Sequence, residues 1–321
     1  MEFFNLTLMQ ILSMFILILA GFIVEKLHLI PEGSDKVISK IETLILVPAL
    51  YLSNQSANCT VKNFTENFPL MFYGLILVLA AIALSYPLSK LFIRGNSPEL
   101  VYRRQIYKYA LTFGNYGYMG NFIVLGIWGD MMFFKYSMFT FFVGIMCTAW
   151  GIYILIPKEN SKGNVLKNLR KGLTNPPFIS LLIGMLLGLT GIGQNLPEFL
   201  PKAFSSAGNC MGPLAMILAG IVIGKYNFKE LISDKKVYIV TFLRLILIPA
   251  IMISVLKLLN TPKEIVTLAL IAFATPLGLN TIVYPASYGG ETKTGASMTM
   301  ISHVLSVITI PVMCLIFIVL W

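Results

Sequence analysis

Two apolar stretches of the chain, residues 109–129 and 271–290, are interrupted by residues that break helices. The interrupting residues are Gly114, Asn115, Gly117 and Gly120 in the first stretch and Pro276, Gly278, Asn280 and Pro285 in the second. Lipid offers no partner to a free backbone N–H or C=O, so an unwound segment at membrane depth must be enclosed by protein or by a water-filled cavity. Paired interruptions of this kind are typical of the mid-membrane binding site of a secondary transporter.

The chemistry expected at such a site is the binding of an anion. Each interruption leaves a second half-helix whose first N–H groups have no partner and carry partial positive charge. If the two breaks cross, these groups face one small volume that favours a carboxylate. Asn115 and Asn280 would add neutral amide donors, which cost less to bury than a charge. Glycine and proline also serve close packing in membrane helices, but two breaks at matching positions favour a site.

The elements that position these residues are expected to be membrane-spanning helices. The chain is 57% hydrophobic and 12% charged, and its mean hydropathy is +0.80, which indicates an all-α integral membrane protein. A span needs about 20 apolar residues. Ten candidates are Leu6–Val24, Val37–Leu52, Pro69–Phe92, Tyr107–Gly126, Phe133–Ile156, Phe178–Leu196, Phe204–Ile223, Val237–Leu258, Ile265–Tyr288 and Gly295–Trp321. The opening ten residues lack the basic region of a signal peptide, so the first candidate is expected to be retained.

The net charge of +10 is explained by the loops. Of the 24 lysines and arginines, 18 lie in one alternate set of connections and 5 in the other. Because basic loops stay in the cytoplasm, both termini are expected outside the cell membrane. The basic excess therefore indicates topology rather than binding to nucleic acid.

The spans divide into two halves around a basic linker, residues 158–175. Five spans precede it in residues 1–157 and five follow in residues 176–321, so the halves would have opposite orientations. Identical residues recur at an offset of 160, as in Phe113 with Phe273 and Ser137 with Ser297. This pattern predicts a five-plus-five inverted repeat in which the broken fourth and ninth spans cross.

Residues that would indicate catalysis or a cofactor are not apparent in the sequence. The four cysteines are scattered without a CxxC pair or a neighbouring histidine, which disfavours a metal site. Phosphate-binding loops, nucleophile elbows and HExxH helices are lacking. The protein is therefore not expected to be an enzyme, and neither a cofactor nor a metal is expected.

The motifs taken together resemble the auxin efflux carrier family, which includes plant auxin exporters and bacterial permeases linked to malonate or malate. The matching segments are VPAL at 47–50, FGNYGYMG at 113–120, NPPFISLLIGMLLG at 175–188, GPLAMILAG at 212–220, LRLILIP at 243–249 and TPLGLN at 275–280. The resemblance extends over essentially the whole chain.

The resemblance implies the fold of bile-acid sodium symporters, with spans 1, 2, 6 and 7 as a scaffold and spans 3–5 and 8–10 as a transport domain that moves like an elevator. The substrate-binding residues it implies are Asn115, Asn175, Val47 and Pro276, to which Tyr116 and Gly117 of the first break and Asn280 of the second are added. The plant carriers have proline and glutamine where this chain has Gly114 and Leu277, and many have a large loop in place of the linker. These departures favour a small organic anion over an aromatic auxin.

Three further residues allow two interpretations each. His303 in the last span could carry a proton or simply be hydrogen-bonded. Arg244 could be functional within its span or reach back to the cytoplasmic surface. Asn175, followed by proline, also fits a helix N-cap.

The sequence therefore predicts a carrier that moves a carboxylate or dicarboxylate across the cell membrane, by efflux or uniport. The acidic residues, including Glu42, mostly lie near the ends of the predicted spans, which disfavours coupling to sodium or protons. Coupled uptake remains the first alternative, and a channel or sensor is the second. The expected partners are the organic anion and the bilayer, with a homodimer left open.

Overall fold

A computed structural model describes residues 2–157, 170 and 172–320 of the 321-residue chain. The described residues form helices and connecting segments without any strand. The helices of the first half are α1 (Glu2–Lys26), α2 (Ser34–Ile41), α3 (Val47–Asn58), α4 (Val61–Phe92), α5 (Pro98–Thr112), α6 (Asn121–Met146) and α7 (Ile152–Leu155). Most of the predicted linker, residues 158–169 and 171, lies outside the described residues.

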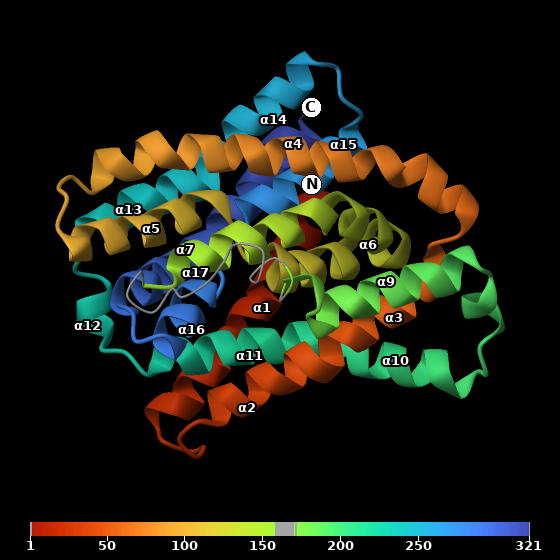
Figure 1. Ribbon diagram of the computed structural model, residues 1–321, viewed down its shortest axis with the longest axis horizontal. Coiled ribbons are helices and arrows are strands. Elements are labelled where there is room, and N and C mark those ends of the chain that lie inside the picture. The colour runs from red at the N-terminus through yellow and green to blue at the C-terminus, as the bar shows by residue number, and fades with distance from the viewer. Residues whose placement is uncertain (1, 158–169, 171, 321) are drawn as a thin grey trace.

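The second half continues the all-helical pattern (Figure 1). Its helices are α9 (Pro176–Leu189), α10 (Phe199–Asn209), α11 (Met211–Gly224), α12 (Phe228–Leu231), α13 (Lys235–Phe242), α14 (Ile248–Leu258), α15 (Lys263–Ala274), α16 (Asn280–Ser287) and α17 (Lys293–Cys314). Five-residue π-helical turns join neighbouring helices at η1 (Glu42–Leu46), η3 (Cys147–Gly151) and η6 (Leu243–Leu247), and η2 (Tyr116–Gly120) leads into α6.

Seven helices among the described residues are long and apolar enough to cross a membrane. This number is lower than the ten predicted stretches for identifiable reasons. The predicted fourth and fifth spans lie in one apolar stretch, Pro98–Leu155, which is unwound at residues 113–115 and turns at Gly129, where φ is +75°. The predicted sixth span is a helix of 14 residues, and the predicted ninth is divided into α15 and α16. The ten-span inverted repeat and the symporter-like fold stay predictions.

The outer surface of the bundle is apolar, as expected when lipid is the solvent, and its interior holds buried polar side chains within a large apolar core. Large side chains such as Ile16, Phe72 and Ile308 are exposed. Buried polar side chains include Gln55, Thr281 and Thr299, all fully enclosed. The chain is therefore a multi-pass membrane protein.

Glycines bring three helix pairs into backbone contact. A Cβ added at Gly220 of α11 would overlap the Ile18 carbonyl of α1, and one added at Gly74 of α4 would overlap the Phe139 carbonyl of α6. At Gly188 of α9, an added Cβ would lie 2.6 Å from the Gln55 carbonyl oxygen of α3. Small residues allow this close approach in membranes. The pairs α1–α11 and α3–α9 join spans that the resemblance assigns to the scaffold, and that assignment stays a prediction.

Candidate functional site

The first interrupted span is unwound between α5 and the π-helical turn η2. The backbone leaves the helical conformation at Phe113, with φ −111° and ψ 131°, and returns to it after Asn115, with φ −83° and ψ 46°. Gly114 between them has no room for a side chain, because an added Cβ would overlap Arg244 Nη2 and lie 2.6 Å from the Thr275 carbonyl oxygen. The glycine thus permits contact with the second break.

The second interrupted span is unwound from Thr275 to Leu279, between α15 and α16. The two interruptions touch, since the Asn115 N–H donates to the Pro276 carbonyl at 2.6 Å. A Cβ added at Gly278 would lie 3.5 Å from Asn115 Oδ1. The broken segments therefore meet at one point, with Asn115 on one side and residues 275–278 on the other, as the sequence led us to expect of the two breaks.

Arg244 lies at this meeting point and is fully enclosed, at 2% exposure. Its Nη1 donates to the Phe273 carbonyl at 2.6 Å, in the last turn of α15. Its Nε and Nη2, like the Thr275 hydroxyl, lack a hydrogen-bond partner among the described residues. Buried donors without partners are costly, and a guanidinium with free N–H groups suits a carboxylate. The side chain is directed into the protein, so the interpretation that it reaches the surface does not fit this conformation.

A second polar cluster joins α16 to α5 beside the breaks. Asn280 Nδ2 donates to the Tyr109 hydroxyl at 2.7 Å and to Cys147 Sγ at 3.8 Å. The Tyr109 hydroxyl and Cys147 Sγ are 3.3 Å apart. The amide donors of Asn280 are thus used to hold the two broken spans together.

Tyr116 and Gly117 form the start of η2, directly after Asn115. The Tyr136 hydroxyl donates to the Tyr116 carbonyl at 3.0 Å, which fixes the turn. A Cβ added at Gly117 would meet no atom within 4 Å, so open space adjoins the first break.

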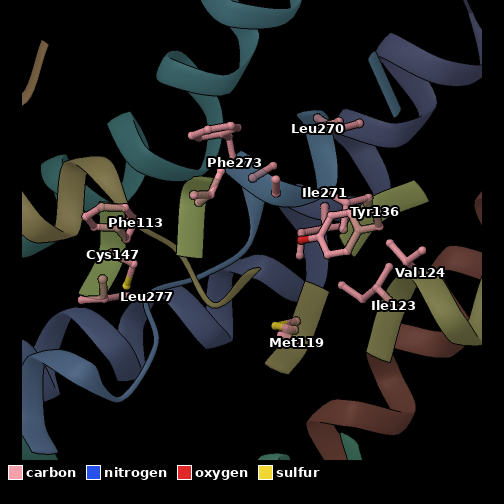
Figure 2. Close-up of a cluster of buried hydrophobic side chains, with 14 of the residues drawn as sticks. Phe113, Met119, Ile123, Val124, Tyr136, Cys147, Leu270, Ile271, Phe273 and Leu277 are labelled. Atoms are coloured by element: carbon pink, nitrogen blue, oxygen red, sulfur yellow. The ribbon is translucent and has the colours of Figure 1, made fainter. Parts of the chain in front are cut away.

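Apolar side chains surround both breaks (Figure 2). Phe113 and Met119 from the first span lie in one buried cluster with Phe273 and Leu277 from the second. Such surroundings have a low effective dielectric, which strengthens electrostatic interactions at the crossing.

A cavity of about 220 Å³ lies where the half-helix after the first break faces three other helices. Its lining residues are Leu50 of α3, Asn121, Phe122, Leu125 and Gly126 of α6, Gly208 and Asn209 of α10, and Met211 and Gly212 of α11. Asn121 and Asn209 are the polar residues of this lining, and Asn121 Nδ2 also approaches the Tyr51 hydroxyl at 3.5 Å. The cavity is apolar apart from these amides.

Comparison with known proteins identifies the family. Residues 6–314 match the model of a family described as "Membrane transport protein". The chain belongs to this family. It is the auxin efflux carrier family, so the resemblance of the motifs is confirmed. The chain is also 22% identical to an uncharacterized transporter from Methanocaldococcus jannaschii over 303 residues, which cover 94% of this chain and 95% of the relative.

Two of the residues expected to bind substrate in this membrane transport protein lie at helix starts. Val47 begins α3 directly after η1 and is 5% exposed. Asn175 caps α9, because its Oδ1 accepts from the Phe178 N–H at 2.8 Å and its Nδ2 donates to the Gly172 carbonyl at 2.5 Å. The capping interpretation of Asn175 therefore matches the structure, and substrate binding by Val47 and Asn175 stays a prediction.

His303 lies one turn from a residue that supports the second break. Its Nδ1 is 2.8 Å from the Thr299 carbonyl, and its Nε2 lacks a partner among the described residues. The Thr299 hydroxyl donates to the Gly278 carbonyl at 3.4 Å, and the neighbouring Ser302 hydroxyl accepts from the Leu277 N–H at 3.0 Å. Neither hydroxyl was predicted from the sequence, although their spacing of three residues in an apolar span is a detectable signal.

Glu42 is the other residue whose environment the sequence did not indicate. It opens η1 inside the candidate span Ser34–Asn58, and its side chain is only 1% exposed. The sequence placed it with the acids near the ends of predicted spans and gave no sign of its burial.

Proposed function

We propose that this membrane transport protein is a secondary carrier that moves a small organic acid anion across the cell membrane. The observation that supports this most directly is the enclosed Arg244, whose free N–H groups adjoin the contact between the two breaks. The Arg244 guanidinium would neutralise one substrate carboxylate inside the membrane, where an unpaired charge is costly. The Asn115 carboxamide, on the other side of the contact, would orient the carboxylate.

The cavity beside the first break would hold the remainder of the substrate. At about 30 Å³ for each water-sized group, 220 Å³ has room for about seven such groups. This volume and its mainly apolar lining favour a small acid over a large aromatic one.

Movement of the substrate is proposed to follow an elevator-type displacement of the broken helices against the pairs α1–α11 and α3–α9. Efflux or uniport needs no further ligand, since the membrane potential assists an outward-moving anion by about 2.3 kcal/mol per charge at 100 mV. Coupled uptake is the second candidate, and the buried Glu42 favours it.

The test is carboxylate flux into liposomes that contain the purified full-length protein. A thermal-shift screen with mono- and dicarboxylates first selects the substrate, because a ligand that binds the folded state raises the melting temperature. Arg244→Gln removes the charge while keeping an amide donor at this position. Removing one partner of a buried charge pair costs about 2–5 kcal/mol, so we expect affinity to fall by at least about 30-fold.

Arg94→Gln is the matched control, since Arg94 is exposed outside the spans. It should bind and transport like the unchanged protein. Full affinity in Arg244→Gln, with a normal melting temperature, would show that the anion binds elsewhere. Unitary currents in a planar bilayer, in place of saturable flux, would indicate a channel.

A further inference from the structure

A carboxyl group is enclosed between two spans without a basic partner. Glu42 Oε1 is shielded from solvent and lacks a hydrogen-bond partner among the described residues. The ion pairs of the described residues are Arg103–Asp234, Lys135–Glu264, Lys225–Asp35 and Lys293–Glu230. Glu42 takes part in none of them. An ionised carboxylate in such a place is strongly disfavoured, and ionisable groups within spans are functional by default.

The charged groups on the elements packed against η1 lie away from this carboxyl. On α2, Asp35 is paired with Lys225, and Lys36 and Lys40 are exposed. Lys202 of α10 is exposed as well, and α9 and α11 contain no acidic or basic residue. The titratable group of α3 is Tyr51, which approaches Asn121. The carboxyl is therefore neutralised most simply by a proton.

A tyrosine of the broken fourth span lies near this carboxyl. Tyr118 of η2 is within electrostatic range of Glu42 and of the neighbouring Thr43. Tyr118 follows Asn115 by three residues. The turn η2 therefore lies between the Glu42 carboxyl and the contact of the two breaks. A displacement of η2 relative to η1 would separate Tyr118 from Glu42 and change the solvation of the carboxyl.

We propose that Glu42 is the proton-binding site that couples carboxylate transport to the proton gradient. This inference rests on the proposed function. The carboxylate takes up one proton where it is enclosed beside Tyr118 and releases it when the displaced turn admits water. Proton binding would then be coupled to the position of the broken span, which favours proton-coupled uptake over uniport.

The experiment measures proton binding without any organic substrate. Liposomes containing the full-length protein are adsorbed on a solid-supported membrane, and a pH jump is applied while the transient current is recorded. We expect the unchanged protein to give a transient current, Glu42→Gln to lose it, and Glu42→Asp to retain it with a shifted pH midpoint. Glu66→Gln is the matched control, because Glu66 is an exposed acid, and it should retain the current.

Three results would overturn the inference: no transient in the unchanged protein, a full transient in Glu42→Gln, or loss of the transient in His303→Gln alone. The melting temperature of each variant shows whether it is folded, and Glu42→Asp keeps the test valid if Glu42→Gln is unstable. Carboxylate flux that persists in Glu42→Gln without pH dependence would support the coupling role. A proton current without any carboxylate flux would instead contradict the proposed substrate class while leaving the proton site in place.

Discussion

Gly114 leaves room for the Arg244 guanidinium at the crossing because it has no side chain. An added Cβ would overlap Arg244 Nη2 and would also press on the Thr275 carbonyl oxygen, a backbone atom, at 2.6 Å. Arg244 could move only by giving up its bond to the Phe273 carbonyl. The position of the Arg244 guanidinium thus depends on the absence of a Cβ at Gly114.

Gly114→Ala is therefore expected to separate the two breaks. We expect a loss of about 1–3 kcal/mol of stability from overpacking and a large fall in carboxylate flux. Gly117→Ala, three residues away, is the control for stability, since its Cβ would meet no atom within 4 Å. Thermal unfolding should distinguish the two variants, and equal melting temperatures would mean that Gly114 does not determine the contact.

Asn175 provides a second test at this scale. Its carboxamide is used within its own helix turn by Phe178 and Gly172, so Asn175→Ala should lose about 1 kcal/mol through the missing cap. Asn175→Ser keeps a capping oxygen and should match the unchanged protein in melting temperature, so its flux reports substrate binding separately from the cap. Reduced flux in a fully stable Asn175→Ser would instead assign this residue to substrate binding, as the family resemblance implies.

At the scale of elements, the interruptions themselves could be predicted, because glycine, proline and asparagine change the local backbone wherever they occur. The residues that support them could not. Arg244, Tyr109 and Thr299 are brought to the breaks by contacts between segments far apart in the chain, and a single sequence does not encode such pairs locally. The buried Glu42 lies in a π turn, and such a turn has no recognised sequence pattern. Local sequence thus indicates where the helices break but not which side chains enclose the gap.

The packing of neighbouring helices should be sensitive to any side chain added at the glycines where they touch. Gly220→Ala would place a methyl group against the Ile18 carbonyl and force α1 and α11 apart, at a cost of about 1–3 kcal/mol. Gly144→Ala, whose nearest outside atom would be Tyr116 Oη at 3.6 Å, should keep or slightly raise the stability. Thermal unfolding in detergent measures both, and an unchanged Gly220→Ala would mean that this helix pair can rearrange.

For the whole molecule, the proposed motion concerns two groups of helices that share direct polar contacts. Gln55 Nε2 of α3 donates to Ser137 Oγ of α6 at 2.6 Å, and Asn54 Nδ2 donates to the Asp130 carbonyl at 2.9 Å. Each contact joins a helix of the predicted scaffold to one of the predicted transport domain. An elevator-type carrier must break both contacts in every cycle.

A cross-link between the two groups of helices should therefore stop transport, whereas a cross-link within one group should not. Gln55→Cys with Ser137→Cys, treated with a short bifunctional thiol reagent in a Cys210→Ser background, should lose flux. The pair Lys135→Cys and Glu264→Cys replaces an ion pair between α6 and α15, both in the predicted transport domain, and should remain active after the same treatment. Continued flux across a completed Gln55–Ser137 cross-link would exclude the proposed displacement.

Glu42, Tyr116 and Arg244 each lie in a π-helical turn. A π turn closes its hydrogen bonds one residue later than an α turn, and such turns are frequent at functional sites. Deleting a single residue from η6 would restore regular helix and keep the span hydrophobic, yet it would change the azimuth of Arg244 by about 100°. The spans of this protein should therefore tolerate many exchanges of one apolar residue for another but few insertions or deletions. Relatives that keep the same number of residues in these spans are then the ones expected to keep the same chemistry.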